Sequence, residues 1–138
     1  MLPNIVLHDL RVLLVEDEMM VSLLIEDVLI EQRCTVVGPF GRLADALAAA
    51  RTEALDLAVL DVNIAGGRVY PVAEVLAGRG VPFVFLSGYG QSAVPREHPD
   101  WQVCSKPFRP IDLVTMLVRQ MNSHQARTPA LAAVKAPE

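Results

Sequence analysis

The stretch "LDLAVLDVN" (residues 55–63) is mostly apolar, and its strand-like part ends in one carboxylate, Asp61. Residues 57–60 fit the middle of a buried strand, because strands covered on both faces form near-continuous apolar runs. A carboxylate is costly to bury without a partner. Its position where the strand emerges therefore calls for a partner elsewhere in the chain.

Short apolar segments alternate with helical patterns along the chain, which is typical of an α/β protein with helices on both faces of a parallel sheet. Strands are expected at residues 11–15, 35–38, 57–61, 83–86 and 102–104. Helices are expected at residues 19–32, 43–52 and 71–77 and from Pro110 onward. This alternation predicts a doubly wound, five-stranded parallel sheet.

The segment "GQSAVPREHPDW" (90–101) stands where a fourth helix would fall, and it contains Pro95 and Pro99. An interior proline costs about 3 kcal/mol in a helix. We therefore expect a short turn or a mobile segment there, with Trp101 as a packing residue.

The chain has 138 residues, which fits one domain. We expect this domain at residues 1–124, followed by a disordered tail at 125–138. A net charge of −4 without a basic cluster argues against direct nucleic-acid binding. No apolar stretch reaches the ~18 residues of a membrane span, and no signal peptide is apparent. Cys34 and Cys104 lie in apolar runs, so we expect buried, reduced thiols in a cytoplasmic protein.

Acidic residues follow two of the predicted strands. Ligands of an open parallel sheet bind beyond the carboxyl ends of its strands, where the strand order reverses. If the strand order is 2-1-3-4-5, Glu16 and Asp17 at the end of the first strand share this crevice with Asp61 at the end of the third. Two unit charges ~5 Å apart repel by ~3 kcal/mol at an effective dielectric of 20. A Mg²⁺ ion with oxygen ligands relieves this repulsion, and Lys106 brings a positive charge to the same edge.

Taken singly, each of these residues has an ordinary explanation. Asp61 suits a turn or a helix cap, and the acidic pair before a helix suits the helix dipole. Ser87 and Lys106 suit a turn and a surface position. Their joint placement at the ends of four predicted strands is what indicates a site.

The pair Met19-Met20 could form a partner surface, although a packed helix start is the commoner outcome.

Four motifs at these positions resemble the receiver domain of two-component response regulators. They are "VLLVEDE" (12–18), "LAVLDVN" (57–63), "FLSGYG" (85–90) and "CSKPF" (104–108), and the resemblance covers about residues 11–122. It implies a flavodoxin-like fold with the sheet order 2-1-3-4-5. The run "FVFLSGYG" (83–90), with the proline-broken segment after it, is similar to a subset of stand-alone receivers.

The resemblance implies that Asp61 is a phospho-acceptor, the nucleophile that attacks the phosphorus of a phosphohistidine donor. Glu16, Asp17, Asp61 and the backbone carbonyl of Asn63 would hold Mg²⁺, for which Mn²⁺ can substitute. The metal and Lys106 would offset charge on the phosphoryl oxygens.

The resemblance also assigns roles around the phosphoryl group. Backbone N–H groups of Val62, Asn63 and Gly88 would bind its oxygens. The Ser87 hydroxyl would move to bind it and so carry the signal. Asn63 and Tyr89 would flank the attacking water and set the lifetime of the phosphate.

Two positions depart from the family pattern. Val103 occupies the place of the aromatic residue that often couples to Ser87, and Tyr89 could take over part of that role. The loop "VNIAGGRVYPV" (62–72) lacks the common proline, which suggests a different docking surface.

The implied partners are a histidine kinase or histidine phosphotransfer protein and an unidentified downstream protein, and a homodimer is left open. Catalysis would be limited to self-catalysed phosphotransfer and autodephosphorylation, so an enzyme in the usual sense is not expected. The alternatives are a Mg²⁺-dependent phosphohydrolase with an Asp nucleophile and an inert flavodoxin-like interaction domain. A phosphohydrolase of this kind needs a second acid two residues after the nucleophile, and Asn63 occupies that position. The intact set of acids, serine and lysine argues against an inert interaction domain.

Overall fold

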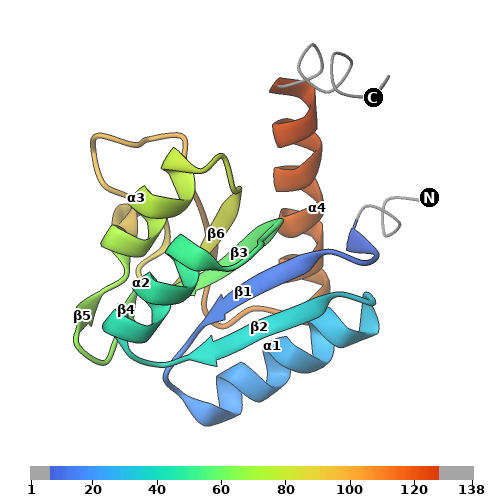
Figure 1. Ribbon diagram of the computed structural model, residues 1–138, viewed down its shortest axis with the longest axis horizontal. Coiled ribbons are helices and arrows are strands. Elements are labelled where there is room, and N and C mark those ends of the chain that lie inside the picture. The colour runs from blue at the N-terminus through green and yellow to red at the C-terminus, as the bar shows by residue number, and fades with distance from the viewer. Residues whose placement is uncertain (1–6, 128–138) are drawn as a thin grey trace.

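A computed structural model describes residues 7–127 of the chain. Within these residues one sheet contains β1 (Arg11–Val15), β2 (Thr35–Phe40), β3 (Leu57–Asp61), β6 (Phe83–Ser87) and β7 (Gln102–Ser105). All of its strand pairs are parallel, and their order is β2-β1-β3-β6-β7 (Figure 1). Counted along the chain this is 2-1-3-4-5, so the predicted flavodoxin-like α/β fold is confirmed.

Helices cover both faces of the sheet (Figure 1). α1 (Met19–Glu31) and α4 (Pro110–Arg127) pack on one face, and α2 (Leu43–Thr52) and α3 (Tyr70–Gly78) pack on the other. Successive strand residues point to opposite faces, so each strand contributes to two hydrophobic cores. The α1–α4 core takes Val12, Leu14, Leu57, Val59, Val84 and Leu86.

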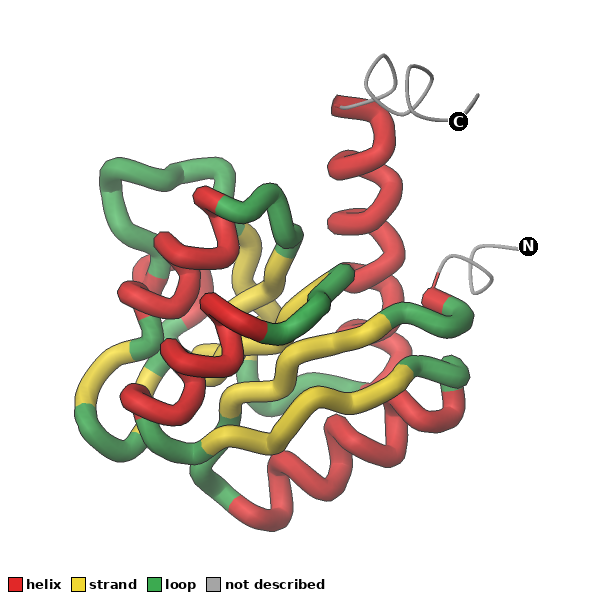
Figure 2. Tube along the Cα trace, viewed as in Figure 1, coloured by secondary structure: helices red, strands yellow, loops and turns green. Residues whose placement is uncertain are grey.

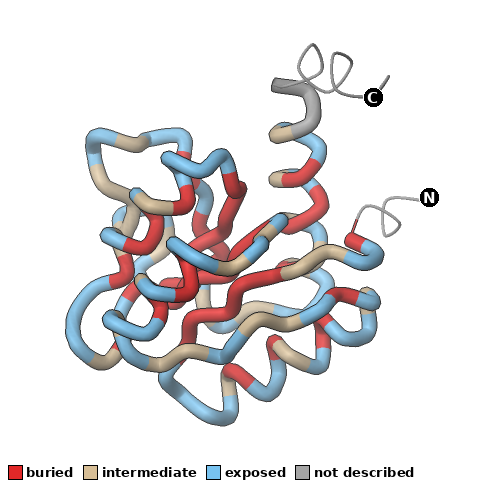
Figure 3. The backbone as a smooth tube through the Cα atoms, in the orientation of Figure 1, coloured by how far each residue is buried: buried red, intermediate tan, exposed pale blue. Residues whose placement is uncertain are grey.

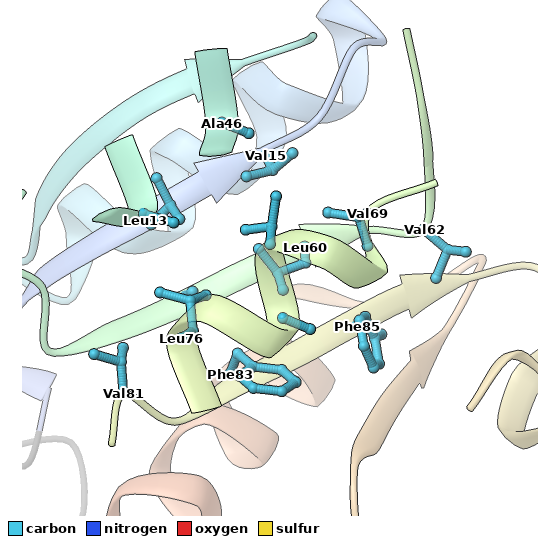
Figure 4. Packing of buried hydrophobic residues seen from close by; sticks show 14 of the residues in the cluster. Leu13, Val15, Ala46, Leu60, Val62, Val69, Leu76, Val81, Phe83 and Phe85 are labelled. Atoms are coloured by element: carbon cyan, nitrogen blue, oxygen red, sulfur yellow. The ribbon is translucent and has the colours of Figure 1, made fainter. Parts of the chain in front are cut away.

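The core on the opposite face takes the alternate strand residues, Leu13, Val15, Leu60, Phe83 and Phe85 among them. Figure 4 shows these side chains gathered between the strands and the helices above them. Ala46, Ala49 and Ala50 are the buried residues of α2. Their small side chains let that helix lie close to the sheet, as the alanine-rich sequence requires.

Several element boundaries differ from the sequence-based expectation. β2 continues through Phe40, where the sequence predicted an end at residue 38, because the Phe40 carbonyl accepts a hydrogen bond from the Glu16 N–H at 3.0 Å. β6 and β7 each include one further residue, α3 begins at Tyr70 and ends at Gly78, and α1 ends at Glu31. α4 continues through Arg127, so residues 125–127 of the expected tail are helical, and 128–138 lie outside the described residues.

A short hairpin directly after β3 was not predicted. β4 (Asn63–Ile64) pairs antiparallel with β5 (Gly67–Arg68). Gly66 and Gly67 have φ of 95° and 142°, values that favour glycine because it lacks a Cβ. The glycine pair therefore makes the turn, and the hairpin lies beside the end of β3 that carries Asp61.

The connection between β6 and β7 contains little regular secondary structure, as predicted. Its one helical element in the described chain is η2 (Gly90–Ala93), a 3₁₀ turn, and Figure 2 draws most of the remainder as loop. Trp101 closes this segment with 8% exposure, and its ring lies 5.1 Å from that of Phe83. Its expected packing role is confirmed.

The outer face of α1 is unusually apolar. Met19 and Met20 are 73% and 74% exposed, so the expectation that they pack at the helix start is wrong. Leu23 and Leu24 are exposed as well, and Figure 3 colours much of α1 as exposed.

Among the described residues, no helix combines the length and the apolar character needed to cross a membrane. Cys34 and Cys104 are buried free thiols.

Candidate functional site

Three carboxylates meet at the carboxyl edge of the sheet. Glu16 and Asp17 follow β1, Asp61 ends β3, and the two strands are neighbours, with Val15 beside Leu60. One carboxylate oxygen from each acid lies within 4.8 Å of the other two. The strand order thus brings together the acids that the sequence analysis expected to share one crevice.

Lys106 supplies the positive charge at this edge. Its Nζ lies 3.0 Å from Oδ1 of Asp61 and 3.8 Å from Oε1 of Glu16. The Lys106 backbone N–H donates to the Ser87 carbonyl at 2.8 Å, which fixes the end of β7 against the end of β6. The Lys106–Pro107 peptide bond is cis. The partner that Asp61 requires is therefore this lysine.

Burial dominates the electrostatics of the cluster. The Glu16 side chain is 0% exposed, and burial, followed by the neighbouring charge of Asp61, raises its pKa to about 7. Burial also raises the pKa of Asp61, although the hydrogen bond from Lys106 acts in the opposite direction. Partial burial lowers the pKa of Lys106, but the hydrogen bond and charge of Asp61 outweigh it and the net shift is upward.

The oxygens of Glu16 test whether the site suits a metal ion. Oε2 accepts a hydrogen bond from the Glu18 N–H at 3.1 Å. Oε1 is buried and has no hydrogen-bond partner among the described residues, which is a costly state for a carboxylate oxygen. Hard divalent cations take carboxylate and carbonyl oxygens as ligands. The orphaned oxygen and the two neighbouring acids therefore fit Mg²⁺.

Close backbone packing positions Asp17. Gly41, in the turn between β2 and α2, is so near that an added Cβ would lie 3.2 Å from the Asp17 Cα and 3.3 Å from its Cβ. A glycine at this position lets the turn lie against the acidic pair. The exposed Asp17 side chain is thereby directed to the edge of the cluster.

The remaining predicted residues surround the acids. Ser87 is buried at the end of β6, and its Oγ accepts a hydrogen bond from the Tyr89 N–H at 3.0 Å. The Val62 N–H donates to the Leu86 carbonyl at 3.2 Å, so this donor is already in use within the sheet. Gly88 is exposed directly after Ser87.

Asn63 and Tyr89 are exposed and line one cavity of about 500 Å³ next to the end of β3. Arg68 and Tyr70 line the same cavity, and the sequence analysis did not single them out. Only Gly66-Gly67 could have pointed to them, because the hairpin turn is what brings Arg68 opposite Asn63. Val103 is buried on β7 beside Phe85.

A parallel sheet of this order, with an acidic triad and a lysine at its carboxyl edge, defines a class of signalling protein. The chain belongs to the response regulator receiver (CheY-like) domain family, which is not a family of classical enzymes. It is 35% identical to SdrG from Sphingomonas melonis Fr1 over 83% of its own length and 97% of the SdrG chain, with a TM-score of 0.70. The BeF₃-activated conformation of SdrG, from Pseudomonas melonis Fr1, is 38% identical over 80% and 95% of the two chains, with a TM-score of 0.67.

More distant structures share the fold. The receiver domain of the sensor histidine kinase PA1611 from Pseudomonas aeruginosa PAO1, solved with a magnesium ion coordinated in its active site cleft, is 21% identical, with a TM-score of 0.67 and coverage of 83% and 98%. The response regulator PhyR from Brucella abortus is 19% identical, with a TM-score of 0.78, and the match covers 98% of this chain but only 56% of PhyR. Neither a protein-family model nor a curated protein sequence matches the chain.

Proposed function

We propose that the chain is a phospho-accepting receiver of a two-component phosphorelay, in which Asp61 takes a phosphoryl group from a histidine kinase or a histidine phosphotransfer protein. One observation carries this proposal. The Asp61 carboxylate lies at the rim of the sheet, 3.0 Å from the Lys106 ammonium and within 4.8 Å of Glu16 and Asp17 oxygens. This arrangement supports a metal ion held by the three acids and a carboxylate oxygen of Asp61 as the nucleophile.

The transfer itself needs little from the protein beyond positioning and charge. An Asp61 carboxylate oxygen attacks the phosphorus, the bond from phosphorus to the histidine nitrogen breaks, and the imidazole leaves with the electron pair and takes up a proton. Lys106 donates a hydrogen bond to the phosphoryl oxygens. Mg²⁺, or Mn²⁺ in its place, held by Glu16, Asp17, Asp61 and the Asn63 carbonyl, would supply further positive charge to the same oxygens.

The switch and the phosphate lifetime involve the surrounding residues. The Ser87 hydroxyl binds the phosphoryl group and gives up its hydrogen bond from Tyr89. Backbone N–H groups of Asn63 and Gly88 contact the phosphoryl oxygens, together with Val62, whose N–H must then be shared with Leu86. The exposed Asn63 and Tyr89 side chains control access of the attacking water and hence the rate of dephosphorylation.

The apolar face of α1 suits the docking of a protein donor. Met19, Met20, Leu23 and Leu24 are exposed, and the helix begins directly after the acidic residues 16–18. Clustered exposed apolar side chains on a folded protein mark a contact surface. A partner seated on this patch brings its phosphohistidine to the rim where Asp61 lies.

Known relatives support the proposal at the level of the family. SdrG has been studied in a BeF₃-activated conformation, and the PA1611 receiver holds magnesium in its active site cleft. We further propose a receiver domain at residues 1–127, because α4 continues past the expected end at residue 124 through Arg127. We also propose a cytoplasmic location, because both cysteines are free and buried. The downstream partner is a protein that distinguishes the two phosphorylation states.

Phosphate uptake tests the proposal directly. With Mg²⁺ and acetyl phosphate, the intact mass of the chain should increase by one phosphoryl group, and the increase should disappear with a chelator or in Asp61→Asn. Asp56→Asn is the matched control, because Asp56 lies at the opposite end of β3 and accepts a hydrogen bond from Arg11 N–H at 2.9 Å. Uptake by Asp61→Asn at the wild-type level, or none by the wild type with Mg²⁺, would contradict the proposal.

A further inference from the structure

One side chain connects the acceptor edge of the sheet to the segment 90–101. Tyr70 is the first residue of α3 and follows the hairpin that begins after Asp61. Its hydroxyl donates a hydrogen bond to the carbonyl of Ala93 in η2. Its ring packs edge-on against Phe85 of β6, with centroids 5.7 Å apart and planes at 77°. Tyr70 therefore contacts both β6 and η2 from the start of α3.

The same helix holds the far end of this segment. Glu74 lies one turn after Tyr70, so both side chains project from one face of α3. Its Oε2 lies 3.0 Å from Nε2 of His98. The His98 ring in turn stacks on Trp101 at 3.8 Å with a 4° angle between the planes. α3 is thus the anchor for a segment that contains no long helix of its own.

The near end of the segment is linked to the phosphorylation site through Ser87. The Tyr89 N–H that donates to Ser87 Oγ lies immediately before η2, and Tyr70 holds the carbonyl at the end of that turn. A cavity of about 500 Å³ between Tyr70, Tyr89 and the hairpin gives the turn room to move. A displacement of the Ser87 hydroxyl would therefore act on the hydrogen bond between Tyr70 and Ala93.

We propose that α3 holds segment 90–101 in its unphosphorylated arrangement, and that Tyr70 is the positioning residue that couples this segment to the state of Asp61. The inference rests on the proposed function, because it takes phosphorylation as the event that releases the segment. Loss of one hydrogen bond of ordinary strength changes a two-state equilibrium by about two- to tenfold. The coupling should have this size.

Tyr70→Phe tests the contact in the unphosphorylated full chain. It keeps the ring against Phe85 and removes the donor. Exchange of the Val94 amide, which donates to Gln91 at 3.1 Å, should become about two- to tenfold faster by NMR. Thr115→Val is the matched control, because it removes a hydroxyl-to-carbonyl hydrogen bond within α4. Glu74→Ala should accelerate exchange at Trp101, whose N–H donates to the His98 carbonyl at 3.1 Å.

A second measurement separates the coupling from the proposed function. With Mg²⁺ and beryllium trifluoride as the phosphoryl mimic, Tyr70→Phe should bind the mimic about two- to tenfold more tightly than the wild type, because the segment is already released. Unchanged amide exchange in Tyr70→Phe, or faster exchange with unchanged affinity, would overturn the inference alone. A wild-type chain that does not bind the mimic would contradict the proposed function and the coupling together.

Discussion

Among single residues, Glu16 has the least ordinary environment in the described chain. Its side chain is fully buried, one oxygen is bonded to the Glu18 N–H, and the other has no hydrogen-bond partner in residues 7–127. Lys106 is 3.8 Å from that oxygen, beyond hydrogen-bond distance, and it is bonded to Asp61 instead. The Lys106 ammonium offsets this charge only in part, so an ionised Glu16 is destabilising unless a further cation binds Oε1.

The pH dependence of Mg²⁺ binding follows from the raised pKa of Glu16. Burial brings this pKa to about 7 in the metal-free chain. Below pH 7 the metal must displace a proton, so the affinity should fall by about tenfold per pH unit. Above pH 7 the carboxylate is already ionised and the affinity should be nearly constant. Calorimetric titration with Mg²⁺ between pH 5.5 and 8.5, at roughly half-unit steps, measures both limbs.

A variant identifies the titrating group. Glu16→Gln should bind Mg²⁺ more weakly and lose most of the pH dependence below pH 7, whereas Asp27→Asn, an exposed acid on α1, should retain it. A Glu16→Gln chain with the full wild-type pH dependence would show that another group controls metal binding.

At the scale of elements, the turn between β2 and α2 is built around one close approach. An added Cβ at Gly41 would lie 3.2 Å from the Asp17 Cα, closer than side chains normally pack. We expect Gly41→Ala to displace the Asp17 backbone by a few tenths of an ångström and to weaken Mg²⁺ binding by about three- to tenfold, because small errors in ligand position are costly for Mg²⁺.

The control for this substitution is Gly78→Ala, because an added Cβ there meets no atom within 4 Å. Gly78 ends α3, and the exchange should leave Mg²⁺ affinity unchanged. Equal affinities for the wild type and Gly41→Ala would show that this approach does not position Asp17.

Elements with a strong local pattern could be predicted with their observed bounds. The strands at 11–15 and 57–61 and the helix at 43–52 are set by apolar runs and by alanine-rich periodicity within the segment itself. β2 ends later than expected because its last residue pairs with Glu16, far away in the chain. The hairpin 63–68 was also not predicted, because two-residue strands are too short to show an apolar or alternating sequence pattern.

The same distinction applies to the site. Glu16, Asp17, Asp61 and Lys106 could be expected together because the carboxyl ends of parallel strands share one edge. The contact between Tyr70 and Ala93 could not, because it depends on the path of a segment that lacks regular structure. Exposure of Met19 and Met20 also depends on which face of α1 the sheet covers, and an apolar helix does not reveal that.

In the molecule as a whole, the acidic cluster and the beginning of the exposed face of α1 lie at the same edge of the sheet. A charge placed on this face should impair a protein donor and spare a small one. We expect Met20→Glu to slow phosphotransfer from a histidine phosphodonor protein by about tenfold or more, because apolar contacts at the centre of an interface carry most of its energy. The rate with acetyl phosphate should be unchanged.

Ile30→Glu is the matched control on the same helix. Ile30 is 61% exposed but lies ten residues further along α1, about 15 Å from Met20. The Ile30→Glu variant should accept phosphate from the protein donor at close to the wild-type rate. If Met20→Glu slowed phosphorylation by acetyl phosphate and by the protein donor equally, the substitution would be acting on the phosphorylation site itself and not on docking.

Acids from separate strands meet at one edge of the sheet, and the proposed consequence is that a single side chain, Asp61, is modified. Chemical mapping tests this modification most directly. The chain is treated with Mg²⁺ and acetyl phosphate and then reduced with borohydride, which converts an aspartyl phosphate to homoserine. The product is digested for peptide mass analysis. Homoserine is expected at position 61 alone, and only when Mg²⁺ is present. Conversion at another acid, or none in a chain that carries phosphate, would contradict it.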